Sequence, residues 1–232
     1  MGYDNASGNR LLLFYCSFTC IYFPGILILL KFNNNLYNVG TYKFIPILII
    51  LMFAEVIKLS FSLLQADHIT LGKNESRFSS RSKRSWTKNL RGIFKFCIAM
   101  ITLSVIYFIV IILFGAPLLT HHEETIMLAL TLTALTFIPA SLHLGIDNAL
   151  ALLTGAQPQN AGLLLEAMRI NVKATLLGSW LGATVIPLDW DRPWQAWPIP
   201  CITGALVGYM MAHFITLIKT LPVLKLNKKL HR

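Results

Sequence analysis

Two aspartates separated by a single residue are the best candidates for metal chemistry in this sequence. Asp189 and Asp191 flank Trp190 in the Asp-x-Asp pattern with which many metal-dependent sugar transferases hold a divalent ion. A Mg²⁺ or Mn²⁺ site normally needs more oxygen ligands than two carboxylates supply. Arg192 follows directly and is expected to pair with one of the carboxylates, which would make the segment rigid. A structural or docking role is therefore favoured, and a metal-dependent membrane transferase using both aspartates is the alternative.

Elsewhere the sequence does not assemble a nucleophile with a base. It contains no Ser-His-Asp order, no zinc-protease helix motif and no phosphate-binding loop. The run from His121 to Glu124 holds two histidines and two glutamates, but consecutive side chains project in different directions. These residues are expected to begin a helix, with the two carboxylates favourably placed at its N-terminus. We predict no catalytic residue, no metal site and no cofactor in this chain.

Four ionisable residues lie inside long apolar segments, where charged groups are expensive. Glu55 and Lys58 are three residues apart, so they share a helix face and can neutralise one another. His143 and Asp147 are four residues apart on what reads as one helix. Each pair forms either a polar functional site or a self-satisfied structural contact. The structural interpretation is favoured for Glu55 and Lys58, whereas both stay open for His143 and Asp147. A lipid carrier or flippase could use all four, but no inverted repeat with broken helices is visible.

The segments that position these residues are typical of a membrane protein. Of the 232 residues, 55% are hydrophobic and only 13% are charged, well below the charged fraction of soluble domains. About 20 apolar residues suffice to cross the hydrocarbon core of a bilayer. The sequence predicts an all-α, polytopic membrane helix bundle, a single integral membrane domain over residues 1–232. Its roughly six spans are Leu11–Leu30, Phe44–Leu64, Phe96–Gly115, Ile126–Leu153, Val172–Ile186 with a start as early as Leu163, and Ile199–Leu221.

The basic residues predict the orientation of this bundle. The net charge is +10, and sixteen of the 20 Lys and Arg residues fall on the side that holds both termini, against three on the other. Because basic loops stay in the cytosol, both termini are predicted to be cytosolic. The segment of about residues 67–95 is expected to be a flexible basic cytosolic loop. The positive charge is assigned to topology and to membrane lipid headgroups rather than to nucleic acid.

The last two predicted spans carry small residues at matching intervals. The spacing small-xxx-small allows close approach of helix backbones in lipid. It predicts a tightly packed helical hairpin over about residues 172–221, capped by a rigid lumenal tip (residues 187–198) that is rich in tryptophan, a residue enriched where membrane meets water. The small residues are Ala174, Gly178 and Gly182 before the tip, and Gly204, Gly208 and Ala212 after it.

This hairpin resembles the signature of the PIG-F family over about Leu177–Tyr209. The matching strings are GSWLGA from Gly178 to Ala183, IPLDWDRPWQ from Ile186 to Gln195, and the following pair Trp197-Pro198. The resemblance implies a multi-pass protein of the endoplasmic reticulum membrane that acts in glycosylphosphatidylinositol (GPI) anchor biosynthesis. It would be the stabilising, non-catalytic subunit of ethanolamine phosphate transferase complexes, which add phosphoethanolamine to mannoses of the anchor precursor. Zinc would lie in the large catalytic partners, which are PIG-O-like and PIG-G-like.

Under this resemblance the hairpin residues acquire expected structural or partner-binding roles. The glycine faces would either pack the hairpin on itself or receive a helix of the partner. The tryptophans would hold the tip at the membrane surface, and the charged tip residues would face the partner. The residues concerned are Gly178, Trp180, Gly182, Asp189, Trp190, Asp191, Arg192, Pro193, Trp194, Trp197, Gly204 and Gly208.

Overall fold

A computed structural model describes residues 2–32, 35–71, 85–117, 120–156 and 162–230. Within these ranges the chain is helical and has no β-strand. The α-helices are α1 (Gly2–Phe32), α2 (Ile45–Leu71), α3 (Ser85–Leu113), α4 (His122–Leu144), α5 (Ile146–Thr154), α6 (Leu163–Ala183) and α7 (Ile199–Leu230). Short 3₁₀ turns are η1 (Asn35–Asn38), η2 (Tyr42–Phe44) and η3 (Pro193–Gln195).

Five of the described helices are long and apolar enough to cross a membrane, which confirms the all-α membrane bundle. The spans are Leu11–Phe32, Tyr42–Leu64, Arg91–Leu113, His122–Leu144 and Ile199–Leu221. The helix α6 has 21 residues and begins at Leu163, the earlier of the two predicted starts. It is less apolar than the others because Glu166, Arg169 and Lys173 lie within it.

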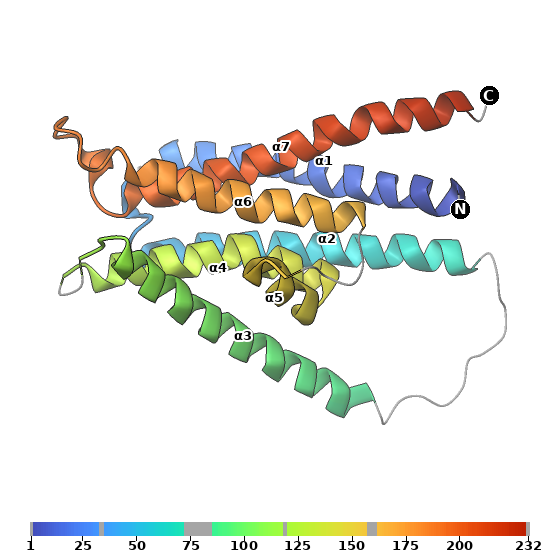
Figure 1. The fold of residues 1–232 in the computed structure, drawn as a ribbon, viewed down its shortest axis with the longest axis horizontal. Coiled ribbons are helices and arrows are strands. Elements are labelled where there is room, and N and C mark those ends of the chain that lie inside the picture. Colours follow the sequence, from blue (N-terminus) through green and yellow to red (C-terminus); the bar gives the residue numbers. More distant parts are fainter. Residues whose placement is uncertain (1, 33–34, 72–84, 118–119, 157–161, 231–232) are drawn as a thin grey trace.

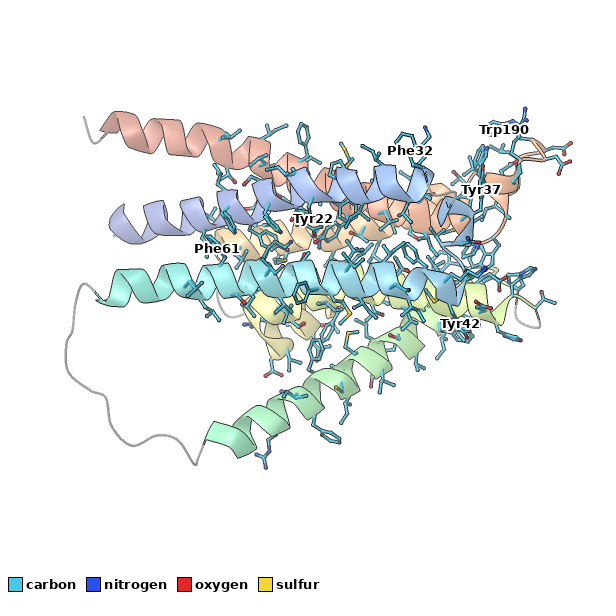
Figure 2. All side chains as sticks on the ribbon, turned by 180° about the vertical axis from the view of Figure 1, so that it is seen from behind. Tyr22, Phe32, Tyr37, Tyr42, Phe61 and Trp190 are labelled. Atoms are coloured by element: carbon cyan, nitrogen blue, oxygen red, sulfur yellow. The ribbon has the colours of Figure 1, made fainter. Side chains whose placement is uncertain are left out.

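The helices run along one long axis, with the chain ends together (Figure 1). The first turn of α1 and the last turn of α7 lie at the same end of the bundle, and the tip between α6 and α7 lies at the opposite end. Exposed aromatic side chains gather at the tip end, among them Phe32, Tyr37, Tyr42 and Trp190 (Figure 2). Aromatic residues of this kind mark the membrane–water boundary. That the terminal end faces the cytosol stays a prediction.

The helix α4 lies at the centre of the bundle and contacts α2, α3, α5, α6 and α7. Of its membrane-length window 78% is buried, against 17% for α3, which diverges from the other helices (Figure 1). Its polar residues are tolerated there because their hydroxyls donate to carbonyls one turn earlier. Thr131 donates to the carbonyl of Met127 at 2.7 Å and Thr136 to that of Leu132 at 2.6 Å.

The structure corrects two predicted segments. The predicted span Ile126–Leu153 is two helices, because Gly145 adopts φ 85° and ends α4 at Leu144. This positive φ is readily adopted only by glycine. The predicted loop of residues 67–95 is shorter than expected, since α2 continues to Leu71 and α3 begins at Ser85. The remainder of that predicted loop, residues 72–84, lies outside the described residues.

Candidate functional site

The two glycine faces of the hairpin pack directly against each other. A Cβ atom added at Gly178 would overlap the carbonyl oxygen of Gly204, and one added at Gly204 would overlap that of Gly178. At Gly182 the obstacle is the carbonyl of Pro200, and at Gly208 that of Ala174. No side chain larger than hydrogen fits at these four positions without moving the backbones apart. The predicted close packing of α6 on α7 is therefore confirmed, whereas a role of these residues in binding a partner stays a prediction.

Gln195 organises the tip, a role that the sequence analysis missed. Its Nε2 donates to the carbonyls of Val185 at 2.9 Å and Leu188 at 2.7 Å. Its Oε1 accepts from the backbone N–H of Arg192 at 3.0 Å. The side chain is buried, so these three bonds satisfy an amide that would otherwise be costly to bury. A single glutamine in η3 thus joins the end of α6 to the segment before α7.

The base of the tip is fixed to the remainder of the bundle. The indole Nε1 of Trp197 donates to Thr125 Oγ1 of α4 at 3.3 Å. Pro198 lies so close to Gly40, between η1 and η2, that a Cβ added there would have to displace its ring. These contacts hold the hairpin against α4 and the η1–η2 segment.

The charged residues of the tip face outward. Asp189, Asp191 and Arg192 are exposed, and Asp191 adopts a positive φ of 45°. The predicted ion pair of Arg192 with either aspartate is wrong, because the structure holds no such contact between these described side chains. The turn is stabilised instead by the Gln195 side chain, which bonds to three backbone groups: the carbonyls of Val185 and Leu188 and the N–H of Arg192. In the described ranges, no three His, Cys, Asp or Glu side chains gather as metal ligands.

An open apolar groove of about 590 Å³ runs along the outer side of the α6–α7 contact. Its α6 wall includes Leu177 and Leu181, and its α7 wall includes Val207 and Met211. These four side chains are between 43% and 55% exposed, an unusual amount for large apolar residues unless lipid or a protein partner covers them. The paired glycines form the floor, since they bring the two backbones together without filling the space above. Trp194 closes the groove at the tip end.

Glu55 and Lys58 lie inside the bundle, at the centre of what we call the charge cluster. They form an ion pair with side chains only 4% and 1% exposed. Tyr209 of α7 donates its hydroxyl to Glu55 Oε1 at 2.5 Å, and Tyr15 of α1 donates to Oε2 at 3.3 Å. Lys58 Nζ donates to Thr19 Oγ1 at 2.8 Å and lies 4.0 Å from the centre of the Tyr15 ring. The predicted mutual neutralisation of Glu55 and Lys58 is confirmed.

His143 belongs to the same cluster, contrary to its predicted pairing with Asp147. Its Nε2 lies 3.8 Å from Glu55 Oε2, and its ring meets that of Tyr15 edge to face. Because the helix ends at Leu144, Asp147 starts α5 and points elsewhere, where its Oδ1 accepts from Lys95 Nζ at 2.6 Å. The remaining members of the charge cluster are Tyr22 and His213. The His213 ring packs against the rings of Tyr15 and Tyr209, and the Lys58 ammonium lies over the ring of Tyr22.

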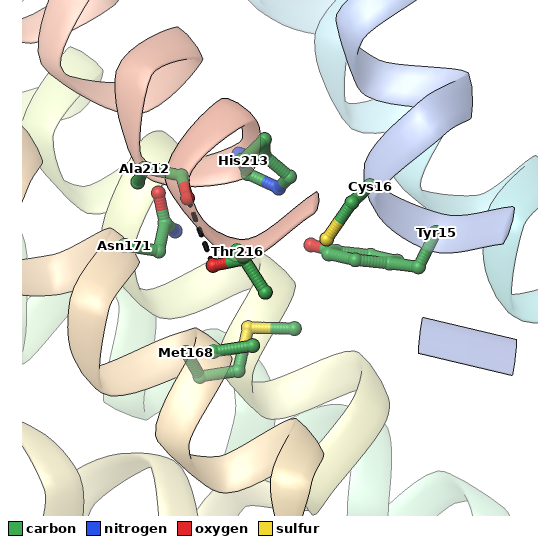
Figure 3. A pocket seen from close by; sticks show the side chains of 8 residues that line it. Tyr15, Cys16, Met168, Asn171, Ala212, His213 and Thr216 are labelled. Atoms are coloured by element: carbon green, nitrogen blue, oxygen red, sulfur yellow. Dashed lines mark hydrogen bonds between the residues drawn. The ribbon is translucent and has the colours of Figure 1, made fainter. Parts of the chain in front are cut away.

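Beside the charge cluster a small pocket lies between α1, α6 and α7 (Figure 3), and it has no room for a water molecule. Tyr15 and Cys16 face Met168 and Asn171 across it, with His213 and Thr216 on the third side. Pockets for small molecules usually measure about 300–1,000 Å³. Asn171 is already engaged, since its Nδ2 donates to the carbonyl of Leu135 at 3.0 Å, and Thr216 donates to that of Ala212. This pocket is a packing defect rather than a substrate site.

Comparison with known proteins places these features in a family. The profile described as the GPI biosynthesis protein family Pig-F matches residues 21–217, which include the tip, most of the hairpin and the charge cluster except Tyr15 and Thr19. The chain belongs to the PIG-F family. The match extends well beyond the segment Leu177–Tyr209 that carries the resemblance in sequence, and it includes α2, α3 and α4.

Several PIG-F relatives carry informative names. A human protein named "GPI ethanolamine phosphate transferase, stabilizing subunit" is 33% identical over 132 residues, which is 57% of this chain and 60% of that protein. Its mouse counterpart is 32% identical over 131 residues, 56% of this chain and 60% of that protein. A Pyricularia oryzae protein named "Glycosylphosphatidylinositol anchor biosynthesis protein 11" is 41% identical over 107 residues, 44% of this chain and 38% of that protein. The matches thus span at most 60% of these relatives, and no solved structure matches the chain.

Proposed function

We propose that this chain is a stabilising, non-catalytic subunit of ethanolamine phosphate transferase complexes that act in GPI-anchor biosynthesis. Membership of the PIG-F family across residues 21–217, with relatives named as stabilising subunits, is the observation that carries the proposal. The reaction would be the addition of phosphoethanolamine to mannoses of the GPI precursor. The complexes would reside in the endoplasmic reticulum membrane, with the tip in the lumen.

The arrangement of polar groups supports a non-catalytic role. Glu55 and Lys58, the most deeply buried ionisable pair, are bonded to each other and to hydroxyls of α1 and α7. The tip carboxylates of Asp189 and Asp191 are exposed. Neither arrangement holds an activated nucleophile beside a base. The zinc that the transfer reaction requires would be bound by the catalytic subunit, which is PIG-O-like in one complex and PIG-G-like in another.

The open apolar groove supports a stabilising role. A subunit that binds only the folded partner raises that partner's stability and abundance by mass action. In a membrane the contact must come from van der Waals packing and polar bonds between helices, and a preformed apolar groove floored by glycines favours the packing. Leu177, Leu181, Val207 and Met211 would pack against the helix of the catalytic subunit. The exposed tip would contact the partner outside the hydrocarbon.

Co-expression tests this function. The full chain would be expressed with a tagged PIG-O-like subunit in cells that lack their own stabilising subunit. We expect the level of the catalytic subunit, and the amount of GPI-anchored protein at the cell surface, to rise together. The purified chain alone should transfer no phosphoethanolamine, whereas the co-purified complex should.

A control distinguishes specific stabilisation from a general effect of expressing a membrane protein. The variant Gly178→Leu would force α6 and α7 apart, and it should fail to raise the level of the catalytic subunit. The proposal would be refuted if the level of the catalytic subunit were the same with and without the wild-type chain. So would transfer activity of the chain by itself.

A further inference from the structure

Lys173 occupies a position in the bundle where a charge is not expected. The α6 residue next to it, Ala174, lies against Gly208 of α7, so Lys173 is level with about Tyr209. The membrane-length segment of α7 is Ile199–Leu221, and Tyr209 is within one residue of its midpoint. At 1.5 Å per residue, the backbone of Lys173 is about 15 Å from either end of that segment. Lys173 is therefore level with the middle of the apolar span of α7, and not at the cytosolic end to which the count of basic residues assigned it.

The side chain of Lys173 is on the outside of the bundle. It is exposed, and it precedes Leu177 and Leu181 by one and two helical turns on the same face of α6. Both leucines line the groove. Lys173 itself does not line the groove, but residues four apart on a helix lie one above the other, so it stands one turn beyond Leu177, next to the end of the α6 wall at Ala174. Met211 of the opposite wall lies at nearly the same depth.

No described residue compensates this ammonium group. The structure shows no ion pair and no hydrogen bond of Lys173 with any described side chain or carbonyl, in contrast to Lys58. The nearest described carboxylate on the same helix is Glu166, two turns away towards the N-terminus of α6. A lysine near the centre of a bilayer is costly even when its side chain reaches towards the surface. A lysine that carries this cost without a counter-charge among the described residues indicates that a partner is missing.

We propose that the groove receives a transmembrane helix of the catalytic subunit, and that this helix carries an aspartate or glutamate that pairs with Lys173. The inference rests on the proposed function and adds the contact surface and the charge of the partner. The apolar walls would supply packing, and the ion pair would fix the depth and rotation of the incoming helix. An acidic residue in that helix would be as costly alone as Lys173 is, so that each subunit would be incomplete without the other.

A phospholipid is the weaker occupant for this position. Lipid phosphates lie at the membrane surface, whereas Lys173 is near the middle of the span, so a phosphate would have to be drawn deep into the hydrocarbon. Lys219 shows the usual arrangement, because it lies 20 residues after Ile199 and so near the end of the span, where its amine can reach headgroups. Depth therefore favours a side-chain carboxylate over a headgroup.

Four full-length chains test the pairing: wild type, Lys173→Leu, Lys173→Arg and the matched control Lys219→Leu. Each would be co-expressed with the tagged catalytic subunit, extracted in a mild detergent and co-purified. We expect Lys173→Leu to lower the recovered catalytic subunit about tenfold, because it leaves a carboxylate unpaired in the hydrocarbon. Lys173→Arg, which keeps the charge, and Lys219→Leu should stay within about twofold of wild type.

The thermal stability of each purified chain alone provides a second readout. Lys173→Leu should melt at the temperature of the wild type or above it, since it removes an unpaired charge from an exposed position. A lower melting temperature would assign Lys173 to the fold of its own chain and overturn the inference. Undiminished recovery of the catalytic subunit would overturn it as well, and loss of an anionic phospholipid alone would identify lipid as the occupant. If the wild-type chain recovers no catalytic subunit, the proposed function fails first.

Discussion

Lys58 and Lys173 both lie in the middle of long helices, yet their surroundings are opposite. Lys58 is 1% exposed, pairs with Glu55 and donates to Thr19. Lys173 is exposed beside the groove and has no such bond to the described residues. Each ammonium group loses free energy of hydration when it is placed inside the protein or the membrane. One is compensated within the chain, and the other would be compensated by a second protein.

The two regions suggest a division of labour within one bundle. The charge cluster joins α1, α2, α4 and α7, which also share a buried apolar core that contains Phe23, Leu51, Leu132 and Leu206. Its ion pair is satisfied within the chain by Tyr15, Thr19 and Tyr209, so the cluster can hold the chain in one packing before any partner arrives. Two of its groups, the Tyr22 hydroxyl and His143 Nε2, are buried without a hydrogen bond to the part of the chain that the structure describes. The hairpin is just as tightly packed along its glycines but presents an apolar groove and a lone charge on its outer side. A stabilising subunit needs both a core that is stable by itself and a surface that is not yet satisfied.

The largest effect is expected inside the charge cluster. Glu55→Leu would leave Lys58 buried without its counter-ion, which should lower the free energy of unfolding of the purified chain by about 3 kcal/mol or more. Thermal unfolding in detergent measures this effect. The double variant Glu55→Leu/Lys58→Leu removes both charges and should recover much of the loss. Equal instability of the single and double variants would show that packing rather than charge governs this region.

A slightly smaller effect is expected where α6 and α7 meet. Gly178→Leu should lower the free energy of unfolding by about 2–3 kcal/mol, since the new side chain collides with the Gly204 carbonyl and separates the helices. The matched control is Gly25→Leu in α1, because a Cβ at Gly25 would meet no atom within 4 Å. We expect no measurable change in that control. If both variants lost a similar free energy of unfolding, leucine would destabilise this bundle irrespective of its position.

Gln195→Ala sharpens the role assigned to the tip. The change removes three hydrogen bonds and leaves the carbonyls of Val185 and Leu188 without their donor, at a cost of about 2 kcal/mol. Limited proteolysis should then cleave residues 187–198 faster than in the wild type. Asp189→Ala is the control, because its exposed carboxylate forms no described ion pair. If the Gln195 variant and the wild type were cleaved at equal rates, Gln195 would not be the residue that stabilises the tip.

The smallest effect is expected at an ion pair on the surface. Asp147 and Lys95 are joined by a 2.6 Å contact, but their side chains are 83% and 52% exposed. Such pairs contribute about 0–1 kcal/mol because water and salt screen them. Asp147→Asn should thus hardly change thermal unfolding. A loss as large as that of Glu55→Leu would contradict the view that burial separates the two classes of charge.

Periodic features of the sequence predicted much of this architecture. The apolar segments located four of the five membrane-length spans within about five residues, although several helices extend further, and the four-residue spacing of Gly178, Gly182, Gly204 and Gly208 predicted the close hairpin. The spacing of Glu55 and Lys58 predicted their contact as well. Each of these inferences depends on residues of one helix or of two helices joined by a short connection. The helical repeat alone determines such neighbours.

Contacts between distant segments were not predictable in the same way. The pairing of His143 with Asp147 assumed an unbroken helix, and a glycine inside an apolar run does not reveal from sequence whether it adopts a positive φ, as Gly145 does. The Arg192 ion pair was expected from charge and proximity, yet the neutral Gln195 holds the turn. Both errors arose because opposite charges are conspicuous in a sequence, whereas backbone conformation and amide bonds to carbonyls are not.

Photo-crosslinking within the intact complex tests the central claim most directly. A photoreactive residue at Leu177 would lie in the groove, and one at Phe53 would lie on the exposed face of α2. The account predicts a strong crosslink from position 177 to a transmembrane segment of the catalytic subunit, and little or none from position 53. A complex that crosslinks through position 53 and not through position 177 would contradict it.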